Sequence, residues 1–258
     1  MTALGILGFA FEKPTTKDFV WPCMIGKGEF CFNFIMLLLL IAFAATILFF
    51  VTGLRNPKVV PGRFQNLVEY GLDFVRTQIG QQMIGPRAEP FMPFLATLFF
   101  FIFFGNILEI VPGISFPLNS RLAFPLVMAL TSWVLYNAVG IREHGFIGYM
   151  KMVLFPPGAP VLIYILLTPI EFLSVIVIRP ITLSVRLFAN MVAGHLLLSV
   201  FFLGSLALLT GVPYVAGVGS GAVSIVLVGF EIFVSALQAF IFTVLTASYI
   251  GGALASEH

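Results

Sequence analysis

Five long stretches of apolar residues constrain the fold of this chain more than any other feature. They cover residues 32–52, 91–111, 122–141, 161–209 and 217–254. A helix that crosses a bilayer needs about 20 predominantly apolar residues, and each of these stretches is long enough. The chain is therefore predicted to be an all-α, polytopic membrane protein with about five transmembrane helices, in which residues 1–258 form a single membrane domain.

The composition excludes the main alternatives to a membrane protein. Only 9% of the residues are charged and 60% are hydrophobic, whereas a soluble domain carries roughly 25% charged residues. A water-soluble fold could not bury so much apolar surface, and a disordered chain would need the opposite composition. The net charge is only +2, and the basic residues are dispersed, so no nucleic-acid partner is expected.

Residues 62–86 lie between the first two apolar stretches and have a different pattern. Within residues 63–84 the apolar side chains recur near the helical period, while Glu69, Asp73 and Arg76 take other positions. This pattern predicts an amphipathic helix in the membrane interface. A short helix in a solvated loop is the alternative interpretation.

The basic residues outside the membrane stretches predict the orientation. Four lie on the side of the N-terminal segment, residues 1–31: Lys13, Lys17, Lys27 and Arg121. Seven lie on the other side: Arg55, Lys58, Arg63, Arg76, Arg87, Arg142 and Lys151. Because cytoplasmic loops are enriched in Lys and Arg, residues 1–31 are predicted to be external and the C-terminus cytoplasmic. External Cys23 and Cys31 would form a disulfide or stay as free thiols, and both interpretations remain open.

A few ionisable residues fall at membrane depth, where each costs free energy and therefore suggests a function. Arg179, Arg186, His195 and Glu231 lie in the last two stretches, Glu171 lies near one end, and Glu109 lies near the end of the second stretch. The spacing from Arg186 to His195 places them on opposite faces of one helix.

The last two stretches are predicted to form an antiparallel hairpin with a polar seam. Its turn centres near residues 210–213, and on the last helix Glu231, Ser235 and Gln238 share one face. Three pairs then fall at matching depths: Arg186 with Gln238, Asn190 with Ser235, and His195 with Glu231. The second helix, residues 217–252, would be about 54 Å long, so it must tilt, kink or project beyond a core of about 30 Å.

The chemistry of this seam suits proton transfer. Histidine and glutamate exchange protons near neutral pH once their pKa values are tuned, whereas arginine stays charged and can serve only as a counter-ion or barrier. Arg186 needs a counter-charge for which His195 competes, so a carboxylate from another subunit is the simplest solution. A static, fully hydrogen-bonded polar cluster is the alternative.

Two sequence motifs resemble subunit a of the F-type ATP synthases. They are PITLSVRLFANMVAGH at residues 180–195 and LQAFIFTVLTASY at residues 237–249. VPGR at residues 60–63 and GNILEIVP at residues 105–112 also match, and the order of elements agrees along nearly the whole chain. The resemblance implies a stator subunit that couples the proton motive force to rotation through two aqueous half-channels. The implied partners are the c-subunit ring, the peripheral-stalk b subunits, the other F1Fo subunits and the lipid of a bacterial-type plasma membrane.

The resemblance also implies residue roles. Arg186 matches the essential arginine, which releases protons from the ring carboxylate and blocks leakage, and Asn190 and Gln238 match polar residues beside it. His195 and Glu231 match the external half-channel pair in the arrangement of mitochondrial relatives. The other implied positions are Glu171 for the cytoplasmic half-channel, although its interval to Pro180 is one residue longer than in that family, and Glu109 for the external end of the second helix.

Other functions fit the sequence less well. A haem- or quinone-binding anchor of a redox complex is the runner-up, but a bis-histidine haem needs two membrane histidines, and only His195 of the three histidines lies within an apolar stretch. A secondary transporter would show an internal repeat, and none is visible. No cofactor or metal site is expected. The chain lacks a phosphate-binding loop, so any ATP chemistry belongs to partner subunits of the translocase complex.

Overall fold

The computed structural model describes residues 32–55, 57–111, 118–155, 161–209 and 214–255, and this part of the chain is built from helices. Five helices are long and apolar enough to cross a membrane, which confirms the predicted all-α, polytopic class. These candidate spans are Phe34–Leu54, Glu89–Ile107, Ala123–Leu154, Ile163–Leu206 and Val215–Leu254. The predicted N-terminal segment 1–31, with Cys23 and Cys31, and the predicted turn at 210–213 lie outside the described residues.

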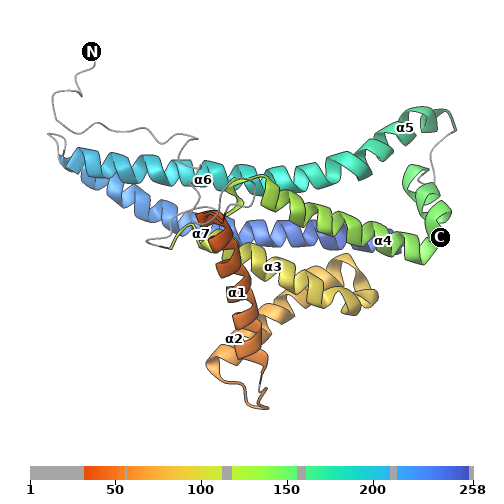
Figure 1. The fold of residues 1–258 in the computed structure, drawn as a ribbon, viewed down its shortest axis with the longest axis horizontal. Coiled ribbons are helices and arrows are strands. Elements are labelled where there is room, and N and C mark those ends of the chain that lie inside the picture. The colour runs from red at the N-terminus through yellow and green to blue at the C-terminus, as the bar shows by residue number, and fades with distance from the viewer. Residues whose placement is uncertain (1–31, 56, 112–117, 156–160, 210–213, 256–258) are drawn as a thin grey trace.

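Helix α1 (Phe34–Leu54) is the most apolar of the five, with a mean hydropathy of 3.0. Asn33 caps its start, because the side chain accepts a hydrogen bond from the backbone N–H of Met36 at 3.1 Å. Figure 1 shows α1 crossing the direction of the long helices instead of running beside them. Most of its large side chains are exposed, as expected for a helix that faces lipid.

The amphipathic segment begins as α2 (Arg63–Phe74) and continues as a π-helical stretch, η3 (Val75–Gln81). Val68, Val75 and Ile79 of this segment are fully buried against the other helices. The segment is joined to the next span by two short 3₁₀ turns, η4 (Gly85–Arg87) and η5 (Glu89–Phe91).

Helices α3 (Met92–Ile107) and α4 (Ala123–Leu154) follow, with a 3₁₀ turn, η6 (Leu118–Ser120), between them. The predicted third span, residues 122–141, falls almost entirely within α4, and the helix continues past it, across a kink, to Leu154. Gly145 breaks the regular backbone inside α4 with a φ of 72°, a value that glycine adopts without strain.

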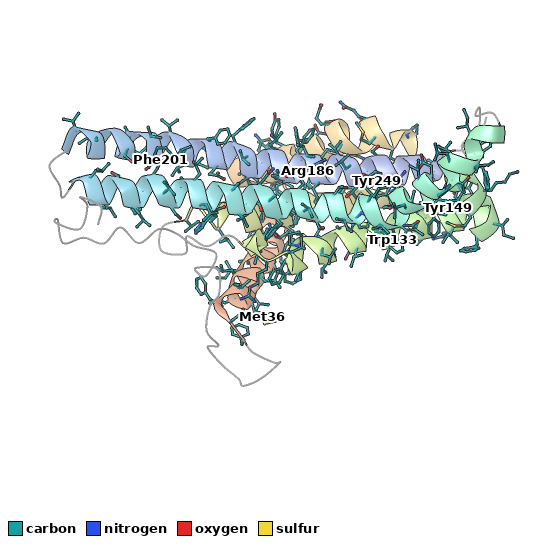
Figure 2. All side chains as sticks on the ribbon, turned by 90° about the horizontal axis from the view of Figure 1, so that it is seen from above. Met36, Trp133, Tyr149, Arg186, Phe201 and Tyr249 are labelled. Carbon is teal, nitrogen blue, oxygen red and sulfur yellow. The ribbon has the colours of Figure 1, made fainter. Side chains whose placement is uncertain are left out.

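The last part of the chain forms the long hairpin. Helix α5 (Val161–Leu173) runs through a π-helical turn, η7 (Ser174–Ile178), into α6 (Arg179–Leu209), and α7 (Tyr214–Leu254) lies beside α6 over its length (Figures 1 and 2). The 41 residues of α7 make it about 62 Å long. This length is about twice the ~30 Å hydrocarbon thickness of a bilayer.

Helices α3 and α4 pack on one side of this hairpin. The core between them combines aliphatic and aromatic side chains. The rings of Phe99 and Phe100, neighbours on α3, meet edge to face with centroids 5.2 Å apart, and the ring centroids of Tyr136 of α4 and Tyr249 of α7 are 5.4 Å apart. Another face of α6 is not covered by the described chain. Ile181, Val185, Leu197 and Val200 are exposed on it.

Candidate functional site

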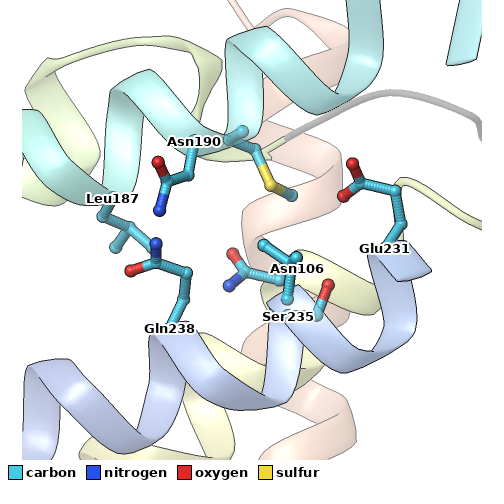
Figure 3. Close-up of a pocket in the computed structure, with 8 residues that line it drawn as sticks. Asn106, Leu187, Asn190, Glu231, Ser235 and Gln238 are labelled. Carbon is cyan, nitrogen blue, oxygen red and sulfur yellow. The ribbon is translucent and has the colours of Figure 1, made fainter. Parts of the chain in front are cut away.

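The middle of the hairpin holds a narrow polar pocket between α6 and α7. Asn190 of α6 faces Ser235 and Gln238 of α7, and Glu231 lies one helical turn before Ser235 on α7 (Figure 3). Leu187, Met191 and Val234 are the other residues of α6 and α7 that line the pocket. The structure therefore brings together four of the residues that the hairpin register had placed on one seam.

A third helix contributes to the same pocket. Asn106 of α3 lines it and is 1% exposed. Its Oδ1 accepts a hydrogen bond of 2.6 Å from Nδ2 of Asn119 in η6, and its own Nδ2 has no partner among the described residues. Neither asparagine was a predicted site residue. The sequence signal for Asn106 was an amide side chain within an apolar stretch, three residues before Glu109.

Glu109, His195 and Glu231 form a cluster next to this pocket, called the Glu109 cluster below. Nδ1 of His195 lies 3.2 Å from Oε1 of Glu109, and the side chains are 20% and 1% exposed. Glu231 is 4% exposed and interacts electrostatically with both. From the antiparallel register of the hairpin, Glu231 alone was predicted to pair with His195. The structure adds a second carboxylate, which comes from the end of the second span.

Gly194 allows this cluster to pack closely. A Cβ atom at this position would overlap the carboxyl group of Glu231, 2.6 Å from its carboxyl carbon. The hydrogen-only side chain of glycine is therefore required for α7 to bring a carboxylate so close to α6.

Arg186 lies on the uncovered face of α6 rather than in the pocket. It is exposed, as are Ala189, Asn190 and Ala193 along the same face. None of the acidic residues in the described parts of the chain forms an ion pair with it. Its guanidinium group is thus available to a group outside this chain.

The other end of α6 borders a cavity of about 400 Å³, called the Glu171 cavity below. Glu171, Arg179, Tyr149 and Tyr249 are among its lining residues. The guanidinium carbon of Arg179 sits 5.0 Å from the ring centroid of Tyr249, a cation–π contact. Arg179 therefore belongs to this cavity.

The two polar regions and Arg186 follow one another along α6. Arg186 comes seven residues after Arg179 and nine before His195, which corresponds to about 10 Å and about 14 Å of helix rise. Figure 2 shows Arg186 part-way along the helix, with Tyr149 and Tyr249 toward one end. Arg186 thus lies along α6 between two groups of ionisable side chains, and ionisable groups within membrane helices often mark ion pathways.

The described helices define a polytopic membrane protein with ionisable side chains between its spans. Residues 34–251 match the family model described as ATP synthase A chain. The chain is 44% identical over 254 residues to the ATP synthase subunit a of Frankia alni, which covers 96% of this chain and 88% of the relative. The subunit a of a Nocardioides species is 40% identical over 265 residues, and that of Gluconacetobacter diazotrophicus is 39% identical over 240 residues. These alignments cover 97% and 91% of this chain, and 96% and 93% of the relatives.

The chain therefore belongs to the ATP synthase A chain family, the proton-translocating stator subunits of the membrane part of the F-type enzyme. The redox-anchor hypothesis is not favoured by this assignment.

Proposed function

We propose that the Glu109 cluster and the Glu171 cavity are the inner parts of two proton half-channels, with Arg186 between them. The observation that carries this proposal is the exposure of Arg186 on a face of α6 that no part of the described chain covers. A charge at membrane depth needs a counter-charge, and a partner subunit that covers this face would supply it. A ring of c subunits, each with a carboxylate, fits this requirement.

In this proposal Arg186 does two things. It attracts the ring carboxylate in its ionised form and so favours release of the proton. As a cation that does not deprotonate, it also prevents protons from passing between the half-channels without moving the ring. Asn190, Ser235 and Gln238 line the route between the Glu109 cluster and the ring, and their polar groups offer hydrogen-bond partners for a proton-carrying water chain.

The direction of each half-channel follows from the distribution of basic residues. If residues 1–31 are external, α3 runs outward, and Glu109 lies near the external surface. Glu171 then lies near the cytoplasmic surface, together with the C-terminus. The peripheral-stalk b subunits and the remaining F1Fo subunits are proposed partners on the same grounds as the ring.

The proposal is tested by replacing Arg186 with alanine in the complete complex. We expect proton-driven ATP synthesis in inverted vesicles to be abolished, while the c ring still copurifies in mild detergent. Val185→Ala is the matched control, because Val185 is exposed on the same face and carries no charge. Near-normal synthesis by the Arg186→Ala complex would refute the role given to this residue.

A further inference from the structure

The junction between α5 and α6 contains a turn that is one residue wider than an α-helical turn. The backbone N–H of Arg179 donates to the carbonyl of Ser174, five residues back, instead of to Val175. Residue 180 is proline and has no N–H to offer. The carbonyl of Val175 is consequently left without a backbone donor from either the α or the π pattern.

Helix α4 supplies the missing donors. Nε1 of Trp133 donates to the Val175 carbonyl at 2.9 Å, and the hydroxyl of Tyr136 donates to the same oxygen at 3.2 Å. Val175 is 2% exposed, so without these side chains the carbonyl would be buried and unsatisfied, at a cost of about 1–3 kcal/mol. The wide turn is therefore matched to two specific side chains of a neighbouring helix.

The wide turn changes which residues share a face. Glu171 and Arg179 are eight residues apart, which on a regular α-helix would separate their directions by about 80°. A turn closed by an i→i+5 bond absorbs one residue, so the two side chains behave as if seven residues apart and diverge by only about 20°. Both residues do line the Glu171 cavity, together with Tyr249.

We propose that the π-helical turn at Ser174–Ile178 is a register device that turns Glu171 into the cavity beside Arg179, and that Trp133 and Tyr136 are the positioning residues that hold it. The consequence for proton transfer rests on the proposed function, because it requires Glu171 to carry protons. The direction in which Glu171 points does not depend on that role and is tested separately.

The first test measures where residue 171 points. Glu171→Cys is made in the full complex with Cys23 and Cys31 replaced by serine, and its reaction with a small, water-soluble methanethiosulfonate is timed in vesicles. Deletion of Ile176 removes the extra residue of the wide turn. The segment can then form a regular α-helical turn, and residue 171 keeps its direction relative to α6. We expect the labelling rate to stay within about threefold, because the direction of residue 171 does not change.

Insertion of one alanine after Ile176 is the opposite change. It rotates residue 171 by about 100°, and we expect labelling of the cysteine to slow about tenfold. In the same background, Phe172→Cys now occupies the former place of residue 171 and should label at the original rate. A deletion that slows labelling as much as the insertion would overturn the register proposal.

The second test measures transport with the native glutamate. Proton-driven ATP synthesis should persist after deletion of Ile176, fall after the insertion, and return when Glu171→Phe and Phe172→Glu move the carboxylate by one position. The expected labelling pattern combined with unchanged synthesis after the insertion would support the register proposal and refute the proton-carrying role of Glu171.

A further variant tests the proposal even if the complex that carries the insertion does not assemble. Trp133→Phe combined with Tyr136→Phe keeps an aromatic ring at each position but removes both donors to the Val175 carbonyl, and we expect slower labelling of the cysteine at 171. Thr131→Val is the matched control, because Thr131 lies on the same helix and its hydroxyl donates to the carbonyl of Val127 within that helix. Unchanged labelling in the double variant would overturn the positioning role of Trp133 and Tyr136.

Discussion

The two polar regions beside α6 are built in different ways. The Glu109 cluster is closed: its two carboxylates are almost fully buried, and Gly194 leaves no spare volume around Glu231. The Glu171 cavity has about 400 Å³ of space and is lined by an arginine and tyrosines. In the first region a proton would pass between buried side chains with little room for water, such as His195 and Glu109, whose polar atoms lie 3.2 Å apart. In the second, water has room to enter and reach the carboxylate.

This difference suggests different sensitivities to mutation. A closed cluster depends on the position of each atom, so small steric changes should block it. An open cavity tolerates changes of shape and depends more on the direction and charge of its few ionisable groups.

The largest effect is expected at Gly194. Gly194→Ala places a methyl group where the Glu231 carboxylate now lies, so the carboxylate must move away from α6. We expect proton-driven ATP synthesis to fall by about tenfold or more, since a displacement of about 1 Å can cost about a hundredfold in a positioned site. Gly219→Ala on α7 is the control, because nothing lies within 4 Å of a Cβ there. Equal activities of the two variants would show that the cluster is not closed.

An intermediate effect is expected at Asn119. Asn119→Leu removes the donor to the buried Oδ1 of Asn106, which costs about 1–3 kcal/mol, and should lower both the thermal stability of the purified complex and its synthesis rate. The double variant Asn106→Leu with Asn119→Leu removes both partners and should regain much of the stability. If the double variant also regains full synthesis, the asparagine pair has only a structural role.

Much of this arrangement was predictable from the sequence. The membrane helices follow from the length of the apolar stretches, and the meeting of Asn190 with Ser235 and Gln238 follows from helical period and the antiparallel hairpin. Both depend on regular geometry within one or two neighbouring helices. The same reasoning places His195 opposite Arg186 along α6, in agreement with the exposed arginine and the partly buried histidine.

The remaining features depend on contacts that periodicity does not encode. Glu109 reaches His195 from the turn after α3, far away in the sequence, and Asn119 reaches Asn106 from a separate turn. The π-helical turn at Ser174–Ile178 changes the direction of Glu171 relative to Arg179, because one absorbed residue rotates the residues before the turn by about 100°. Only Pro180 hints at this irregularity in the sequence, and proline alone does not specify a π turn.

The smallest effect is expected at Tyr249 in the open cavity. Tyr249→Phe keeps an aromatic face under the Arg179 guanidinium and should leave synthesis nearly unchanged. Tyr249→Leu removes the cation–π contact, worth about 0.5–2 kcal/mol, and should slow synthesis only a few-fold, because Arg179 remains in a spacious cavity and water can solvate it. Rates are compared in vesicles with equal amounts of assembled complex. A loss in Tyr249→Leu as large as that in Gly194→Ala would mean that the Glu171 cavity is as constrained as the Glu109 cluster, and the contrast between the two regions would be wrong.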